Sequence, residues 1–180
     1  MKIQWLARVS PLLLLSASAV GAENLYVGAK VGSVTADNFG PLVESRTSID
    51  DSDTSYGLFV GYHILDTLAI EGGYNYLGEY ALKDVAGGSY EASSFDVVLK
   101  ASGNVTDSLA LYAKGGVAAY DWKASGAGVK SDDSGVAPTI GFGSEFSITP
   151  AMKVGLEYQI YQDIGGVNID SFNIALSHSF

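Results

Sequence analysis

The sequence predicts an all-β chain that forms an eight-stranded antiparallel up-and-down transmembrane β-barrel. Apolar and polar residues alternate with a period of two in eight successive segments, each of about ten residues. The connections between these segments are alternately long and short. The 180 residues include 22 glycines, 11 tyrosines and no cysteine, a composition that favours strands and tight turns without disulfide bonds or thiolate metal ligands.

Residues 1–22 are predicted to be a cleaved signal peptide, and residues 23–180 the barrel domain. Two basic residues, an apolar core at 11–15 and the small residues 20–22 follow the order of a secretory signal. That core is too short to span a bilayer, and no other apolar run approaches the roughly 20 residues of a membrane helix. The chain is therefore expected to be exported through its signal peptide to the outer membrane of a Gram-negative bacterium.

The charge of the chain makes nucleic acid an unsuitable partner. Its formal net charge is −10, and removal of the predicted signal would leave 8 basic and 20 acidic residues. The acidic stretch Asp50-Asp51-Ser52-Asp53 lacks the ligand spacing and glycine of a calcium-binding EF-hand loop. We interpret it as a solvated loop that contacts the phosphates of lipopolysaccharide through divalent ions. No cofactor and no resident metal are expected.

The strands are expected at 25–32, 55–64, 68–77, 89–103, 109–121, 135–147, 151–161 and 169–180. In the first, Leu25, Val27 and Val31 alternate with Tyr26, Gly28 and Lys30. In a membrane barrel the apolar face meets lipid, and the small and charged residues line the lumen. Long connections are expected after the first, third, fifth and seventh strands, and short turns after the others. Short turns are typical of the periplasmic end, which places both termini there.

The chain resembles the transmembrane domain of the outer membrane protein A family. The similar stretches occur in the same order along nearly the whole segment after the predicted signal, at 26–32, 59–63, 70–78, 106–112, 148–150 and 156–159. The resemblance implies an eight-stranded barrel. Many members continue into a peptidoglycan-binding domain, but this sequence ends at Phe180, so cell-wall tethering is not expected. A terminal phenylalanine after alternating apolar residues also resembles the signal read by the barrel assembly machinery.

Six charged residues are predicted to face the lumen and to form one mixed network: Glu71, Lys100, Lys114, Glu145, Lys153 and Glu157. Family members hold a gate of paired charges in the lumen. The matching positions are Glu71, Lys100 and Glu145, with the arginine partner replaced by Gly155 and Lys153 one inward step away. We expect Glu71 to approach Lys100, and Glu145 to approach Lys153, across neighbouring strands. Unpaired ions inside so narrow a barrel are costly, so this network is expected to block the lumen.

No catalytic residue is predicted. The only histidines are His63 and His178, and the side chains of His178 and Ser179 point to opposite faces of one strand, so they cannot act as a pair. The expected role is therefore structural or surface-interacting, in a monomer that contacts outer-membrane lipids and lipopolysaccharide. Two alternatives stay open: a narrow low-conductance ion pore gated by the lumen charges, and an adhesin or host-defence evasion factor acting through the outer loops.

Overall fold

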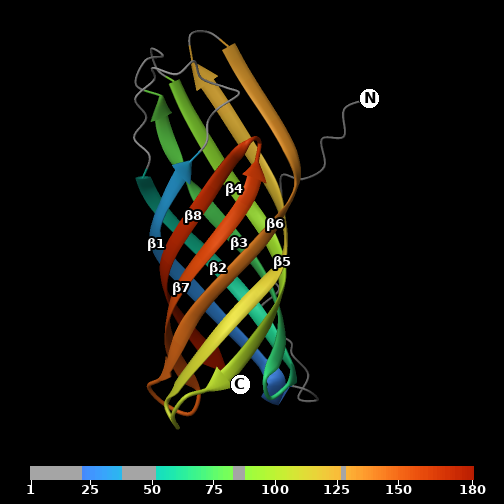
Figure 1. Ribbon diagram of the computed structural model, residues 1–180, viewed down its shortest axis with the longest axis vertical. Coiled ribbons are helices and arrows are strands. Elements are labelled where there is room, and N and C mark those ends of the chain that lie inside the picture. Colours follow the sequence, from blue (N-terminus) through green and yellow to red (C-terminus); the bar gives the residue numbers. More distant parts are fainter. Residues whose placement is uncertain (1–21, 38–51, 83–87, 127–128) are drawn as a thin grey trace.

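A computed structural model describes residues 22–37, 52–82, 88–126 and 129–180 and shows a closed antiparallel barrel (Figure 1). A short 3-10 turn, Ala22–Asn24, precedes the first strand. Each strand pairs with the next along the chain, and pairing of β8 with β1 closes the barrel. The eight-stranded up-and-down fold is thereby confirmed. The strands are β1 Leu25–Asp37, β2 Ser52–Leu65, β3 Leu68–Leu82, β4 Gly88–Asn104, β5 Leu109–Gly126, β6 Val129–Ser147, β7 Met152–Ile164 and β8 Val167–Ser179.

The two faces of each strand follow the period-two pattern. Leu58, Phe142 and Ile174 expose more than half of their side-chain surface on the outside of the barrel. The charged residues on the opposite, inward faces of the strands, among them Lys30 and Glu71, are buried in the lumen. This apolar exterior suits contact with lipid chains. No helix within the described ranges is long and apolar enough to cross a membrane.

All eight strands continue beyond their predicted ends at one end of the barrel, which we call the loop end. The opposite end, with the connections 66–67, 105–108 and 148–151, is the turn end. At the loop end β5 and β6 pair up to Gly126 and Val129, and β7 and β8 are joined through Gly165 and Gly166. The expected long connections after the fifth and seventh strands were therefore wrong. Most residues of these two expected loops form strand, because the backbone pairing of β5 with β6 and of β7 with β8 continues through them. The predicted signal peptide lies outside the described residues, apart from Ala22.

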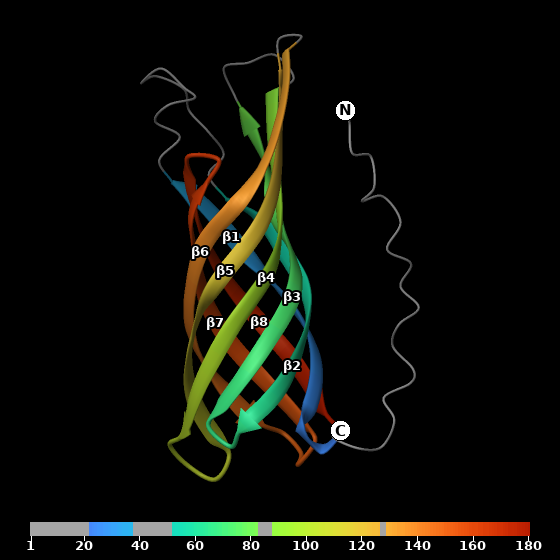
Figure 2. The same ribbon diagram turned by 90° about the vertical axis from the view of Figure 1, so that its right-hand side faces the viewer.

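The β7–β8 turn bends into the barrel mouth. Asp163, Gly165 and Gly166 have φ angles of 59°, 62° and 91°, a left-handed conformation that favours glycine. This bend buries Ile164 and Val167 completely. The β5–β6 hairpin continues straight and rises above the turn, as both views show (Figures 1 and 2).

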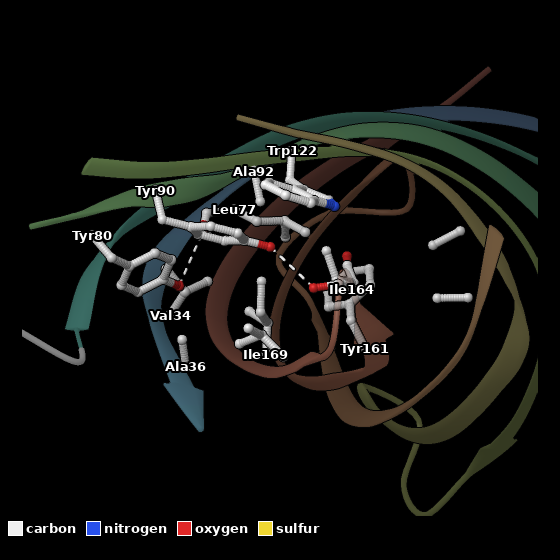
Figure 3. Close-up of a cluster of buried hydrophobic side chains, with 13 residues drawn as sticks. Val34, Ala36, Leu77, Tyr80, Tyr90, Ala92, Trp122, Tyr161, Ile164 and Ile169 are labelled. Atoms are coloured by element: carbon white, nitrogen blue, oxygen red, sulfur yellow. Dashed lines mark hydrogen bonds between the residues drawn. The ribbon is translucent and has the colours of Figure 1, made fainter. Parts of the chain in front are cut away.

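Apolar side chains fill the lumen at the loop end (Figure 3). Tyr90 stacks on Trp122 with ring centroids 5.7 Å apart, and its hydroxyl donates to the carbonyl of Ile164 at 3.0 Å. We call this cluster the apolar core; it consists of Val34, Ala36, Leu77, Tyr80, Tyr90, Ala92, Ala118, Trp122, Ala137, Tyr161, Ile164, Val167 and Ile169. The sequence had predicted small and charged residues throughout the lumen, so this end of the interior differs from expectation. Ile164 and Val167, at the tip of the β7–β8 turn, pack with eleven other residues of this core, which come from β1 and from β3 to β8.

Candidate functional site

The middle of the lumen contains a chain of ion pairs centred on Lys100 of β4. Its ammonium group lies 3.2 Å from Glu71 on the neighbouring strand β3 and also contacts Glu145 on β6. The second carboxylate oxygen of Glu145 lies 3.7 Å from Lys153 on β7. The two neighbouring-strand contacts expected from the sequence, Glu71 with Lys100 and Glu145 with Lys153, are both present.

Lys114 joins the remaining members to this chain. Its ammonium group lies 2.7 Å from Glu157 and 4.0 Å from Glu71, so it connects β7 with β3 across the lumen. Lys30, which the sequence placed on the inward face but not in the network, lies 2.8 Å from the other oxygen of Glu157. The structure thus brings all six predicted residues together and adds a seventh charge.

Tyrosine hydroxyls from two strands complete the coordination of the carboxylates. Tyr26 donates to Glu71 at 2.6 Å, and Tyr112 donates to Glu157 at 3.1 Å. The ammonium group of Lys100 also lies 4.3 Å from the ring centroid of Tyr112, within the range of a cation–π contact. Alternation put both tyrosines on the inward face, but their contacts depend on how the barrel curves.

Asp96 is the fourth carboxylate of the lumen, and it accepts hydrogen bonds from neutral donors. It accepts hydrogen bonds from Asn75 at 2.8 Å, Ser94 at 2.7 Å, Gln159 at 2.9 Å and Tyr161 at 2.9 Å. Gln159 also accepts from Lys30 at 2.9 Å, so this group is continuous with the network. The four lysines of the described lumen are matched by four carboxylates: Lys30, Lys100, Lys114 and Lys153 against Glu71, Asp96, Glu145 and Glu157. The interior is therefore electrically balanced.

Inward glycines make room for these long side chains. A Cβ atom at Gly61 would lie 2.0 Å from the Tyr26 ring, and one at Gly143 would lie 2.6 Å from the Tyr112 ring. Each ring therefore lies directly over a glycine of the adjacent strand. This contact places the hydroxyl of the tyrosine at its carboxylate.

Gly61→Ala is accordingly expected to lower the free energy of unfolding by about 1–3 kcal/mol, the usual cost of adding a methyl group to a filled interior. The new methyl group would displace the Tyr26 ring and break its hydrogen bond to Glu71. Urea unfolding in micelles measures the effect. The matched control is Gly103→Ala, because a Cβ there has no heavy atom within 4 Å. Equal stability of the two variants would contradict this account.

The space left inside the network is small. One cavity of about 20 Å³ is lined by Asn75, Asp96 and the charged residues, and a second of about 10 Å³ lies toward the turn end beside His63. A single water needs roughly 10–15 Å³ on this measure. These two volumes admit one or two waters.

The two histidines do not form a catalytic arrangement with each other. The ring of His63 packs against Tyr26 at 4.9 Å inside the barrel, whereas His178 points outward with its ring edge-on to Phe180 at 5.1 Å. Within the described ranges, no group of three or more His, Cys, Asp or Glu side chains is placed to hold a metal ion. Of the acidic loop residues, Asp50 and Asp51 lie outside the described ranges, and Asp53 accepts the backbone N–H of Glu79 at 2.6 Å.

A closed eight-stranded barrel with an apolar exterior and a charge-filled interior defines a small membrane β-barrel protein. The family profile described as the OmpA-like transmembrane domain matches residues 21–175, so the chain belongs to this family, which implies an outer-membrane location. It is 33% identical over 149 residues to outer membrane protein A of Shigella flexneri, and 32% identical over 152 residues to that of Salmonella typhi. Each alignment covers 79% of this chain and 42% of the relative, so the chain spans less than half the length of these relatives.

Solved structures of other small barrels share the fold. Neisserial surface protein A superimposes with a TM-score of 0.66 and 13% identity, over 87% of this chain and 97% of that one. The attachment invasion locus protein of Yersinia pestis gives 0.59 and 13%, over 88% and 99%. At such low identity these similarities establish the architecture alone.

Proposed function

We propose that this protein is a sealed outer-membrane barrel with a structural and surface-interacting role in the cell envelope. The turn end faces the periplasm in this proposal, and the loop end faces the outside. The observation that carries the proposal is the closure of the lumen by two different fillings in series. The charge network occupies its middle and the apolar core its loop end.

The two fillings resist ion passage for different physical reasons. In the network, every lysine is within reach of a carboxylate, so a passing ion would have to separate paired charges in a narrow interior. In the apolar core, an ion would lose its hydration shell without gaining polar ligands. Rearrangement of the charges alone would leave the second barrier in place, which favours a sealed barrel over the narrow pore.

Planar-bilayer recording tests this proposal. The purified chain is expected to produce no conductance steps. Glu71→Ala and Lys100→Ala are expected to stay silent too, because the apolar core still closes the loop end. A refolded general porin in the same bilayers provides the positive control. Reproducible steps from the wild-type chain, raised by Lys100→Ala, would overturn the sealed barrel and favour the ion pore.

The contacts expected with lipids, lipopolysaccharide and the assembly machinery fit this role. Outward aromatic rings, including Tyr56, Tyr74 and Phe172, are more than half exposed on the exterior of the barrel, where they can contact lipid. Phe180 is exposed, and its backbone N–H donates to Leu25 at 3.1 Å, so its ring remains available on the outer surface of the turn end. Recognition of Phe180 by the barrel assembly machinery remains part of the proposal, as does the monomeric state.

A further inference from the structure

The exterior of the barrel has a hollow on the face formed by β5 to β8. Its volume is about 380 Å³, compared with about 20 and 10 Å³ for the two cavities of the lumen. Ser144 of β6 lines the hollow together with Leu111 of β5 and Leu156 of β7, which are in register with it on the two neighbouring strands. The two leucines are 53% and 46% exposed. A small outward side chain between two large ones thus leaves a depression in the apolar surface.

Three aromatic rings form the wall of the hollow on the side toward the loop end. Phe142, Tyr158 and Phe172 line it and are in register across β6, β7 and β8. The ring centroids of Phe142 and Tyr158 lie 5.4 Å apart. The hydroxyl of Tyr158 donates to Asp170 at 2.9 Å, which fixes the direction of this ring. Contacts within the barrel therefore hold the wall in place.

The depth of the hollow corresponds to one leaflet of the bilayer. Phe142 lies five residues from Ser147, where β6 ends at the turn end. Five residues span about 17 Å along a strand and, at the usual barrel tilt of about 40°, about 13 Å across the membrane. Half of the hydrocarbon core is about 15 Å thick. Because Ile148 and Phe180 are still exposed apolar residues at the turn end, the hollow lies in the leaflet at that end, and the aromatic wall lies near the bilayer middle.

A hydrocarbon chain is the occupant that fits this place. The hollow is continuous with the lipid-facing surface, and its exposed walls are apolar, so water would find few partners there. An unfilled gap would forfeit dispersion contacts. Leu111 and Leu156 lie on the two strands beside β6, about 10 Å apart, so the depression is one strand wide. The convex exterior of a second barrel cannot reach the floor of so narrow a depression, whereas an unbranched chain can.

We propose that the hollow beside Ser144 binds one acyl chain of a phospholipid. The chain extends from the turn end to the aromatic wall, so its terminal methyl group meets Phe142 and Tyr158 and its headgroup lies at the turn-end surface. Protein contacts it on several sides, and it therefore exchanges more slowly than lipid elsewhere around the barrel. The source of the chain rests on the proposed function, because a turn end in the periplasm places the hollow in the phospholipid leaflet and not in the lipopolysaccharide leaflet.

The test uses the full chain in nanodiscs of phosphatidylcholine and two photoreactive phosphatidylcholine probes. One probe carries a diazirine at the end of an acyl chain, and the other carries it beside the carboxyl group; mass spectrometry of digested protein locates the modified residues. The chain-end probe is expected to modify the region of Phe142 and Tyr158 about fivefold or more above that of Leu99, because the wall adds dispersion contacts. Leu99 is the matched position, since it points outward on β4 and also lies five residues from its strand end. The carboxyl-side probe should react nearer to Phe146.

Substitutions at Ser144 separate the hollow from the rest of the exterior. Ser144→Leu fills the depression and is expected to lower modification near Phe142 to the level found near Leu99. Ser144→Ala keeps the depression and should leave modification unchanged. Ala101→Leu is the matched control, because Ala101 is exposed and lies three residues from the end of β4, as Ser144 does from the end of β6. An unchanged heat-induced shift on gels verifies that each variant still forms the barrel.

Each other result counts against the proposal in a recognisable way. Equal modification around the whole barrel would reduce the hollow to ordinary lipid contact. Unchanged modification in Ser144→Leu would assign the signal to another part of the surface. A reversed order of depth for the two probes would show that the chain enters from the loop end. Two barrels in one nanodisc, separated by Ser144→Leu, would identify a second copy as the occupant.

Labelling on cells separates failure of this site from failure of the proposed function. The chain contains no cysteine, so Ser134→Cys and Asp107→Cys each carry a single thiol. On intact cells an impermeant maleimide should label the first at the loop end and not the second at the turn end. Correct labelling without enriched modification of the hollow would overturn the acyl-chain site alone. Reversed labelling would overturn the proposed orientation and with it the phospholipid source.

Discussion

Lys100→Met is expected to lower the free energy of unfolding by about 3–5 kcal/mol, the usual cost of removing one partner of a buried ion pair. Lys100 contacts both Glu71 and Glu145, and its side chain is only 7% exposed. Without it, Glu71 would retain Lys114 at 4.0 Å, and Glu145 would retain Lys153 at 3.7 Å. At these distances Lys114 and Lys153 do not fully offset the negative charges of Glu71 and Glu145 in a closed interior. Urea unfolding of the refolded chain in micelles measures the loss.

Lys153→Met is the matched control for Lys100→Met, because Lys153 also pairs with Glu145. Its side chain is 32% exposed and water screens the pair, so the expected loss is below about 1 kcal/mol. A double change, Lys100→Met with Glu145→Gln, should recover part of the stability by removing one uncompensated charge. If Lys100→Met and Lys153→Met cost the same, the network is not the buried, coupled unit described above.

Tyr90→Ala is expected to lower stability by a similar amount, about 3–5 kcal/mol, the range for truncating a large buried aromatic residue. Tyr90 is 2% exposed, stacks on Trp122 and donates to Ile164. Its loss would open a cavity in the apolar core and free the β7–β8 tip. The native Trp122 provides a fluorescence signal for unfolding at this place, and hydrogen exchange should show faster opening of the loop ends of β4 and β5.

Tyr90→Phe separates the packing of this ring from its hydrogen bond. The ring is retained and one hydrogen bond is lost, so the expected cost is about 0.5–1.5 kcal/mol. Amide hydrogen exchange at the turn end should stay unchanged in both Tyr90→Ala and Tyr90→Phe, because the apolar core is confined to the other end of the barrel. Uniformly faster exchange along all strands of Tyr90→Ala would show that the core is not a separate stabilising unit.

The order of residues along each strand was sufficient to predict the two faces of the barrel. A strand places successive side chains on opposite sides, so Leu58 and Glu71 could be assigned to lipid and lumen from alternation alone. Neighbouring-strand pairs were also accessible, because consecutive strands of an up-and-down barrel lie side by side. The contacts of Glu71 with Lys100 and of Glu145 with Lys153 are of this kind.

Contacts across the lumen could not be predicted in the same way. Lys30 and Glu157 belong to strands separated by β8, and Lys114 and Glu157 to strands separated by β6. Such side chains meet only because the sheet closes with a particular tilt and stagger, which depend on all eight strands together. Alternation shows that Lys30 points inward but carries no information about which carboxylate stands opposite.

The apolar core at the loop end shows most clearly which features follow from local alternation and which depend on the folded barrel. Alternation could place Tyr90 and Trp122 on one face, yet whether that face meets water or other side chains depends on where the β7–β8 turn goes. The turn enters the lumen because Asp163, Gly165 and Gly166 adopt positive φ angles. That one bend completes the apolar core. A local pattern specifies the direction of a side chain, whereas its surroundings are specified by distant segments that only the folded barrel brings together.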